Sequence, residues 1–420
     1  MIKSVVAAGV VSILWVVVGY SLCFGESFHG IIGNPFTHLF FKGVSSGAPW
    51  SLAPSIPLTL FALFQLMFAI ITPGLVVGAV AERIRFTSYI LFIALFSLFV
   101  YAPIAHWTWH PDGFLFKWGV LDFAGGTVVH MSAGFAALAA SIYLRDKGEK
   151  KSAISPANIP FVLLGTGLLW FGWYGFNPGS TLSAMDFEGI GRVATNTTLA
   201  ACAAGLTAMI YAYIPNKKWD VSFTVNGFLA GLVAITCPCY WVSPTGAILL
   251  GGVAGVIVVA GVELLEWLRI DDPIGAVPVH GICGIWGTLS LGLFACGKYG
   301  ATGPVAPDNS APLTGLFYGG GTQVLIAQAI GSLIVTSATF SVAMAVMYLV
   351  NLTGTLRVSA EGAVYGLDLH EHGISAYPEY VISALAAPAG MSSQPHIAEP
   401  SPSLAAAKAL QRVAMETKIS

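Results

Sequence analysis

The chain has 420 residues, of which 56% are hydrophobic and 9% are charged, and its formal net charge is −2. Soluble globular domains carry about 25% charged residues, so this composition excludes an ordinary soluble protein. A near-neutral chain without a basic cluster gives no support to nucleic-acid binding. The composition therefore predicts an all-α, polytopic membrane protein embedded in the lipid bilayer.

Apolar runs of membrane-spanning length recur along the chain. A helix crosses the roughly 30 Å hydrocarbon core with about 20 residues, and ten such runs are found at 4–25, 57–81, 88–109, 123–144, 159–181, 195–214, 222–241, 246–265, 275–297 and 323–350. We expect the membrane domain to cover residues 1–352. Residues 353–377 are polar and are expected to form a cytoplasmic segment. Residues 378–420, rich in Pro, Ser and Ala, are expected to be a disordered tail.

The distribution of lysine and arginine sets the expected orientation, because short cytoplasmic loops retain positive charge. Ten spans put both termini on one side. That side holds fourteen of the 18 Lys and Arg residues, with the densest group at 145–151. We therefore place both termini in the cytoplasm, with the protein in the plasma or inner membrane of the cell.

Polar and aromatic residues interrupt several spans. The second span contains Gln65, Phe68 and the sequence Thr72-Pro73-Gly74, where the proline should kink the helix. The third span leaves the membrane at Trp109. The fifth ends at Asn177-Pro178-Gly179, a sequence that stops a helix. These positions predict that an aromatic-rich group of side chains gathers near one surface of the membrane.

Two cysteines, Cys237 and Cys239, lie near the end of the seventh span. A lone CxC is weak evidence for a metal site, and we expect these thiols to pack in the core. The alternative is a disulfide from one of them to Cys296.

The fourth and ninth spans contain the same sequence pattern. Residues 122–134, DFAGGTVVHMSAG, and residues 272–284, DPIGAVPVHGICG, share Asp, Gly, Val, His and Gly at a constant offset of 150 residues. The two spans are five apart, so they run in opposite directions, which is typical of an inverted-topology repeat. Such repeats place their site at the shared interface, where we expect His130 and His280 to meet.

The depth of the two histidines sets a condition on this geometry. Straight helices, at about 1.5 Å per residue, would leave the two rings roughly 15 Å apart in depth. The rings meet only if the starts of both helices, at Gly125-Gly126 and at Pro273–Pro278, lie sunk below the membrane surface. Asp122 and Asp272 would then cap the two helices there.

These ionisable residues allow more than one interpretation, although an ionisable residue inside a membrane span points by default to function. A neutral imidazole pair can line a narrow apolar pore and relay a proton; the alternative is a structural pair satisfied by backbone carbonyls. Asp122 and Asp272 either cap helices only or also attract a cation. Asparagine in place of Asp122 should cap nearly as well without the charge.

The predicted topology brings a second group of side chains onto one path. Trp109 and Ser180 end outward-running spans, Phe176 lies one turn below Ser180, and Phe68 lies deeper. Ring faces would hold a small cation, at about 0.5–2 kcal/mol each, and the Ser180 hydroxyl would accept a hydrogen bond from it. The alternative for each ring taken singly is a place in the core or in the aromatic belt.

These motifs resemble those of the ammonium transporter family, the Amt, Mep and Rh proteins. The resemblance covers residues 3–377 and is carried by GYSLCFG, FAIITPGLVVGAVAERIRF, IAHWTWHPDG, LDFAGGTVVH, WFGWYGFNPGS, DDPIGAVPVHGICG and GLDLHEHGISAY, with several stretches closest to the Amt branch. It implies a stacked gate of Phe68 and Phe176, an outer ammonium site with Trp109 and Ser180, a pore lining with Trp173, an essential Asp122, and the twin histidines His130 and His280. It also implies a homotrimer with one pore per subunit and a PII-type signal protein at the cytoplasmic face. No cofactor or metal is implied.

The residues and the resemblance together predict an ammonium transporter or channel, not an enzyme. It would carry ammonium or methylammonium into the cell through a hydrophobic pore lined by the twin histidines. The alternative hypothesis is a membrane ammonium sensor that signals through its cytoplasmic tail. A third, weaker hypothesis is a neutral-gas channel of the Rh kind.

One departure from the family concerns the first helix. The family has eleven spans, with the N-terminus outside, and its first span ends in an aromatic-Gly-Gly-Leu-Val motif that this sequence lacks. We expect either a truncated start or the loss of one helix. Every pore residue named above is nevertheless present.

Overall fold

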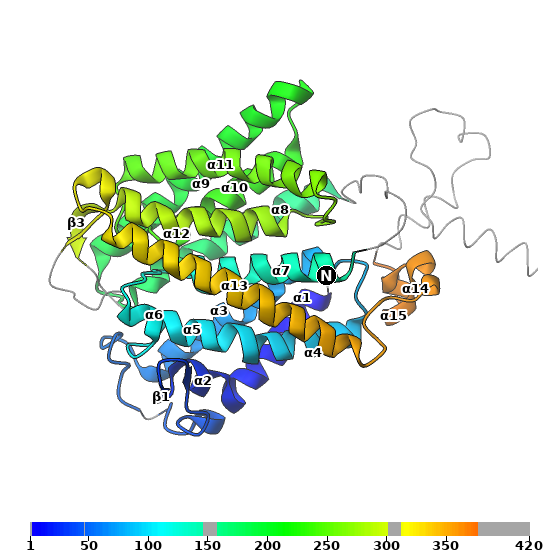
Figure 1. Cartoon of the computed structure of the whole chain (residues 1–420), viewed down its shortest axis with the longest axis horizontal. Helices are drawn as coiled ribbons and strands as arrows, with labels where there is room; N and C mark the ends of the chain where they lie inside the picture. Colours follow the sequence, from blue (N-terminus) through cyan, green and yellow to red (C-terminus); the bar gives the residue numbers. More distant parts are fainter. Residues whose placement is uncertain (1, 46, 146–157, 301–311, 377–420) are drawn as a thin grey trace, which may run out of the picture. The chain divides into compact units, whose positions relative to one another are not determined.

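The computed structural model describes residues 2–45, 47–145, 158–300 and 312–376. Within these ranges, nine helical stretches are long and apolar enough to cross a membrane. In Figure 1 the long helices of the larger unit, Met1–Val80 with Ile90–Leu349, lie side by side.

The bounds of the first five stretches are as follows. The first is α1 (Ile2–Leu14), η1 (Trp15–Gly19) and α2 (Tyr20–Phe24); the second is α3 (Leu58–Leu75) and η3 (Val76–Val80). The third is α4 (Phe86–Phe96), η4 (Ser97–Tyr101), α5 (Ala102–Trp109) and α6 (Phe114–Lys117). The fourth is η5 (Gly126–Met131) and α7 (Ser132–Tyr143), and the fifth is α8 (Ile159–Phe176) and η6 (Pro178–Thr181). As expected, α8 ends where Asn177-Pro178-Gly179 begins.

The last four stretches are α9 (Phe187–Asn216), α11 (Pro244–Trp267), η7 (Val277–Ile282) with α12 (Cys283–Phe294), and α13 (Gln323–Asn351). Two short antiparallel pairs lie in the loops: β1 (Ser27–Phe28) with β2 (Ile32–Gly33), and β3 (Cys296–Gly300) with β4 (Pro312–Thr314). The turns η2 (Leu39–Phe41) and η8 (Leu316–Tyr318) are single 3-10 turns. The predicted all-α membrane fold is confirmed.

One predicted span is shorter than expected. The run 222–241 forms α10 (Val221–Thr236), which is 16 residues long, and the following residues, 237–241, form buried turns. Pro238 has no N–H with which to continue the helix. The ten predicted spans therefore correspond to nine full-length helices and this shorter one.

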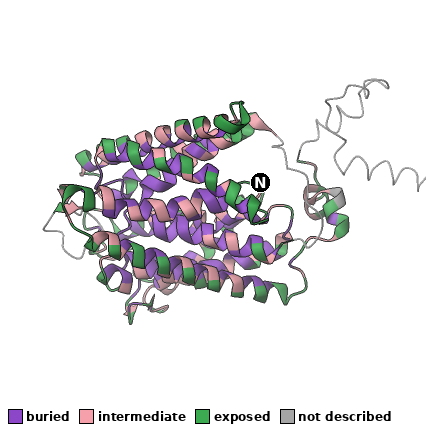
Figure 2. Cartoon of the chain, turned by 45° about the horizontal axis from the view of Figure 1, so that its top comes forward, coloured by how far each residue is buried: buried purple, intermediate pink, exposed green. Residues whose placement is uncertain are grey.

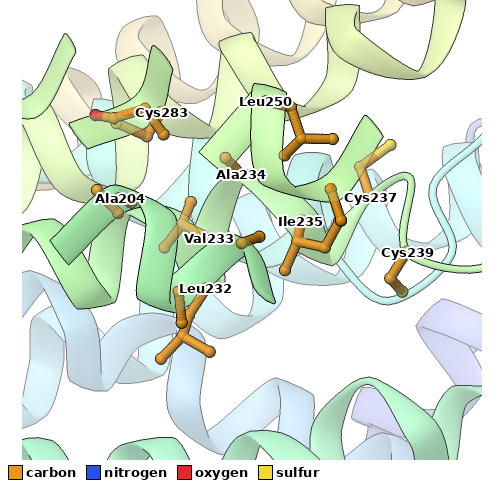
Figure 3. Packing of buried hydrophobic residues seen from close by; sticks show 14 of the residues in the cluster. Ala204, Leu232, Val233, Ala234, Ile235, Cys237, Cys239, Leu250 and Cys283 are labelled. Carbon is orange, nitrogen blue, oxygen red and sulfur yellow. The ribbon is translucent and has the colours of Figure 1, made fainter. Parts of the chain in front are cut away.

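Small residues bring α9, α10 and α11 into close contact. A Cβ added to Gly231 of α10 or to Gly251 of α11 would collide with the backbone of Ala200 in α9. Helices in lipid associate through such close packing, because burying apolar surface from other apolar chains gains little. Figure 3 shows the packed side chains around this region, and Figure 2 shows exposed residues on the outer helix faces.

The two halves of the repeat cross at glycines. Gly134 in α7 leaves no room for a Cβ against the backbone of Gly281 in η7, and Gly284 in α12 packs less tightly on Met131, where an added Cβ would lie 3.0 Å from the Met131 Cγ. The 150-residue offset converts the pair 134–281 into the pair 284–131, so the two contacts are equivalent. This reciprocal contact is the geometry expected of an inverted repeat.

A smaller unit contains Ala81–Tyr89 and the chain from Val350 onward. Ile84 pairs with Arg357 in an isolated antiparallel bridge, and the Glu371 carboxylate accepts a hydrogen bond from the Phe86 N–H at 3.0 Å. Two short helices, α14 (Ala360–Tyr365) and α15 (Leu367–His372), complete the described part. Within the predicted polar segment, 353–377, the described residues thus contain two short helices and one isolated bridge. The predicted tail, 378–420, and most of the basic group at 145–151 lie outside the described residues.

Candidate functional site

His130 and His280 lie against each other where the two halves of the repeat meet. Their Nδ1 atoms are 3.2 Å apart, and the ring centroids are 5.2 Å apart with an angle of 10° between the planes. The His130 side chain is 1% exposed, whereas His280 is partly exposed. The distance fits one shared hydrogen bond, in which one Nδ1–H donates and the other Nδ1 accepts. The structure therefore brings together the two rings as the repeat predicts.

Both histidines lie in π-helical turns, η5 and η7. In η5 the Gly125 carbonyl accepts hydrogen bonds from the N–H groups of both Val129 (2.9 Å) and His130 (3.0 Å). Such single turns are frequent at functional sites, because the extra residue re-aims the side chains of the turn. Sequence reasoning missed them. Two residues in the sequence could have indicated these turns. They are Gly125, which adopts a φ of 110°, and Pro278, which lies inside η7.

Asp122 caps the start of the helix that carries His130. Its Oδ1 accepts from the N–H groups of Gly125 (2.9 Å) and Gly126 (2.7 Å), and its Oδ2 accepts from those of Thr127 (2.8 Å) and Val128 (3.1 Å). The Thr127 hydroxyl donates to Oδ2 as well. The first N–H groups of a helix have no partner within the helix, and here one carboxylate satisfies four of them.

This cap corrects one expectation. Because both oxygens of Asp122 accept hydrogen bonds from N–H groups, an asparagine would turn its own NH2 group towards some of these donors. Asparagine would therefore lose about half of the cap, and the expectation that it caps nearly as well is wrong.

Asp272 caps the start of the other helix of the repeat, the one that carries His280. Its Oδ1 accepts from the Ala276 N–H at 3.1 Å, and its Oδ2 accepts from the Val277 N–H at 2.7 Å. Gly275, between the carboxylate and the helix, has a φ of 73°, which favours glycine. Both aspartates therefore cap the helices that carry the histidines, as expected from the sequence.

A small pocket lies near Asp122, since Phe123 lines it and Trp109, another lining residue, donates to the Asp122 carbonyl. We call it the aromatic pocket, and its lining consists of Phe64, Gln65, Phe68, Trp109, Phe123, Ser180 and Leu182. It has room for about one water-sized group. The Trp109 Nε1–H donates to the Asp122 carbonyl at 2.9 Å, and the Trp109 and Phe68 rings meet edge to face at 5.5 Å and 84°.

Two oxygen atoms of the aromatic pocket are available as acceptors. The Ser180 hydroxyl donates its hydrogen to the Phe176 carbonyl at 2.8 Å, and no described residue donates a hydrogen bond to its lone pairs. Gln65 is 4% exposed, and its Oε1 has no hydrogen-bond partner within the described ranges. Sequence reasoning noted Gln65 but gave it no role. The signal was its spacing from Phe68, since residues i and i+3 share a helix face.

Stacked rings connect the aromatic pocket to the histidines. Phe68 lies 4.5 Å from Phe176, Phe176 lies 5.7 Å from His130, and Trp173 stacks on His130 at 5.3 Å and 16°. All of these distances join ring centroids. The Trp173 Nε1–H donates to the Thr236 hydroxyl at 3.0 Å, which fixes the indole. The predicted site residues therefore form one continuous group, apart from Asp272, which caps the start of the helix that carries His280.

The cysteines take no part in this group through a disulfide. All six are free, so the disulfide alternative is wrong. The Cys237 and Cys239 thiols are buried and donate to backbone carbonyls. Within residues 2–376, apart from the undescribed gaps, no cluster of three His, Cys, Asp or Glu side chains could hold a metal ion.

Comparison with known proteins identifies the family. The sequence profile described as Ammonium Transporter Family matches residues 1–377. The chain belongs to the ammonium transporter family. An ammonium transporter of Mycobacterium tuberculosis is 38% identical over 410 residues, which cover 92% of this chain and 85% of that protein. Ammonium transporter Amt2 of Archaeoglobus fulgidus is 37% identical, with 93% and 83% covered.

Solved structures agree with this assignment. A structure titled Sensor Amt Protein superposes with a TM-score of 0.77 at 32% identity, covering 88% of this chain and 89% of that one. Saccharomyces cerevisiae Mep2 superposes with a TM-score of 0.77 at 33% identity, covering 85% and 81%. The family resemblance inferred from the motifs is confirmed, and this ammonium transporter homologue is a multi-pass membrane protein.

Asp122→Ala should reduce transport to less than a tenth of the parental rate, because it leaves four buried N–H groups without an acceptor, at about 1–3 kcal/mol for each unsatisfied group. Asp122→Asn should fall between Asp122→Ala and the parental chain. The measurement is methylammonium uptake per folded transporter, with folded protein quantified by size-exclusion chromatography in detergent. Full transport by Asp122→Ala would contradict the role assigned to the cap.

Proposed function

We propose that this ammonium transporter homologue carries ammonium into the cell through a pore that runs from the aromatic pocket to the histidine pair. The observation that supports this path is the unbroken series of ring contacts from Trp109 through Phe68 and Phe176 to His130. A substrate that enters the pocket has the gate rings directly behind it and the histidines behind the gate.

Recognition in the aromatic pocket would select an ion that donates hydrogen bonds. Ammonium can donate to the Ser180 hydroxyl oxygen and to Gln65 Oε1 while ring faces stabilise its charge, at about 0.5–2 kcal/mol per ring. Potassium has a similar size but donates no hydrogen bond and cannot release a proton. Selection would therefore rest on chemistry and not on diameter.

Passage beyond the gate would require loss of a proton. The rings leave little polar surface between the aromatic pocket and His130, and a cation that enters an apolar passage loses several kcal/mol of hydration. Ammonia carries no charge, so it can cross, while the proton moves separately or remains outside. The buried Nε2 of His130, which has no partner in the described part of the chain, offers ammonia or a proton a polar contact in this passage.

The orientation in the membrane follows from the positive-inside rule. We place the aromatic pocket outside and both termini inside the plasma or inner membrane. An impermeant thiol reagent applied to intact cells should then label Lys117→Cys, whose native side chain is 58% exposed, and spare Lys218→Cys in the exposed loop after α9. The opposite labelling pattern would show the reverse orientation.

A homotrimer and a PII-type partner at the inner face belong to the same proposal.

Uptake of methylammonium in a cell without its own ammonium transporters tests the function itself. We expect saturable uptake into the cell, with recorded currents reporting any separately carried charge. The alternative is an ammonium sensor, a reading favoured by the likeness to the structure titled Sensor Amt Protein. Saturable binding to the purified protein without uptake would favour the sensor and refute the transporter.

Aspartate in place of one histidine should weaken selectivity against potassium. In His130→Asp or His280→Asp, a carboxylate would draw water and cations into the passage, and about 1.4 kcal/mol of added stabilisation corresponds to about tenfold more potassium flux. The loss of selectivity against potassium should be larger than the loss of ammonium-driven flux. The measurement is the ratio of ammonium to potassium currents at equal amounts of assembled protein.

Two results would count against this account of the histidines. Normal assembly with both fluxes unchanged would show that the pair does not control permeation. Reduced ammonium flux with potassium still excluded would keep the site but reject a dry filter. A purely structural pair would instead cause loss of folded protein.

A further inference from the structure

A glutamine in α13 forms hydrogen bonds to the backbone of Leu121, the residue before Asp122. Gln328 is fully buried, and its Oε1 accepts from the Leu121 N–H at 2.7 Å while its Nε2 donates to the Leu121 carbonyl at 2.7 Å. Nε2 also donates to the Thr288 carbonyl in α12 at 3.2 Å. One side chain thus satisfies both backbone groups of one residue and ties it to two helices.

Leu121 needs such a partner because it lies in a non-helical strap. We define the strap as residues 120–123, which connect the turn after α6 to the cap of η5. A non-helical backbone at membrane depth is tolerated only where the protein satisfies its polar groups. Cys237, labelled in Figure 3, supplies further bonds, since its carbonyl accepts from Phe123 N–H at 3.3 Å and its thiol donates to the Leu121 carbonyl at 3.2 Å.

The strap carries functional groups of the aromatic pocket. The Asp122 carbonyl accepts the hydrogen bond that orients Trp109, and Phe123 lines the pocket. α13 holds this strap at a second point one turn further along, where Gly331 packs on Val120 so closely that an added Cβ would meet the valine side chain. Gln328 and Gly331 share a helix face by their i, i+3 spacing.

We propose that Gln328 is a positioning residue for the aromatic pocket, which fixes Leu121 and thereby the Asp122 carbonyl that orients Trp109. The inference rests on the proposed function, because it concerns the recognition of ammonium at that pocket. Without the amide, the Leu121 N–H would be buried without a partner, and the strap would shift to find one. Trp109 would then lose its fixed orientation, so the effect falls on substrate affinity.

The test uses methylammonium uptake by the full chain, with KM and maximal rate expressed per folded transporter. Gln328→Met keeps the length of the side chain and removes its hydrogen bonds. We expect KM to rise about tenfold, the order that one unsatisfied buried group is worth, while the maximal rate changes less. Gln328→Asn keeps the amide but is one methylene too short to reach both Leu121 atoms, and it should raise KM as well.

Thr339→Val is the matched control. Thr339 is a fully buried polar residue on the same helix, and its hydroxyl has no hydrogen-bond partner among the residues described. KM and maximal rate should both stay at the parental values. A tenfold rise in KM for Thr339→Val would show that any change in the buried face of α13 has this effect, and would overturn the specific role of Gln328.

A double variant tests the route through Trp109. If Gln328 acts by orienting that indole, Gln328→Met should raise KM little further in a Trp109→Leu background, because neighbouring effects on one group do not add. Full additivity would overturn the route. An unchanged KM in both Gln328 variants, or failure of both to accumulate as folded protein, would reduce Gln328 to a structural role and refute the proposal.

The proposed function and this inference fail in different ways. A parental chain that takes up methylammonium supports the proposed function whatever the Gln328 variants do. If the parental chain binds methylammonium without uptake, the proposed function fails, and the positioning role is read from the dissociation constant instead. A tenfold weaker constant in Gln328→Met, with Thr339→Val unchanged, would then still support the role of Gln328.

Discussion

Inside a bilayer the backbone has no water to bond with, so each N–H and C=O group needs a partner within the protein. This requirement is hardest to meet where a span follows a buried, non-helical segment, as the helix of His130 does. The Asp122 carboxylate meets it by accepting hydrogen bonds from four successive N–H groups. Because the first N–H groups of that helix have acceptors, the non-helical strap can lead directly into it. The helix then carries His130 in the protein interior.

The same strap links the two ends of the proposed path. Its Asp122 carbonyl orients Trp109, and its Asp122 side chain caps the turn that holds His130. A displacement of the strap would therefore move the recognition pocket and the histidine together. This coupling gives a physical reason for a buried amide at Gln328, which bonds to both backbone groups of Leu121.

The sequence was sufficient for much of this arrangement and insufficient for part of it. The offset of 150 residues predicted the meeting of His130 and His280, because an inverted repeat has one shared interface. The π-helical turns that carry the two histidines were not predicted, because the sequence pattern does not show which carbonyl each N–H of a turn will bond. Gln328 was also missed: one glutamine in an apolar span shows neither its partner nor its depth. The end of α10 at Thr236 was missed although Pro238 marked it, because the apolar run continued to Trp241.

The hydrogen bond between the two Nδ1 atoms has a direction, because one ring donates and the other accepts. If a proton enters at the Nε2 of one ring and leaves from the Nε2 of the other, the donor and the acceptor exchange roles. A second proton cannot follow the same route until the pair has returned to its first tautomeric arrangement. A relay through two imidazoles would therefore deliver protons singly, with a reset between deliveries. In the proposed relay, the 3.2 Å contact between the two Nδ1 atoms would thus limit the number of protons carried at a time as well as their path.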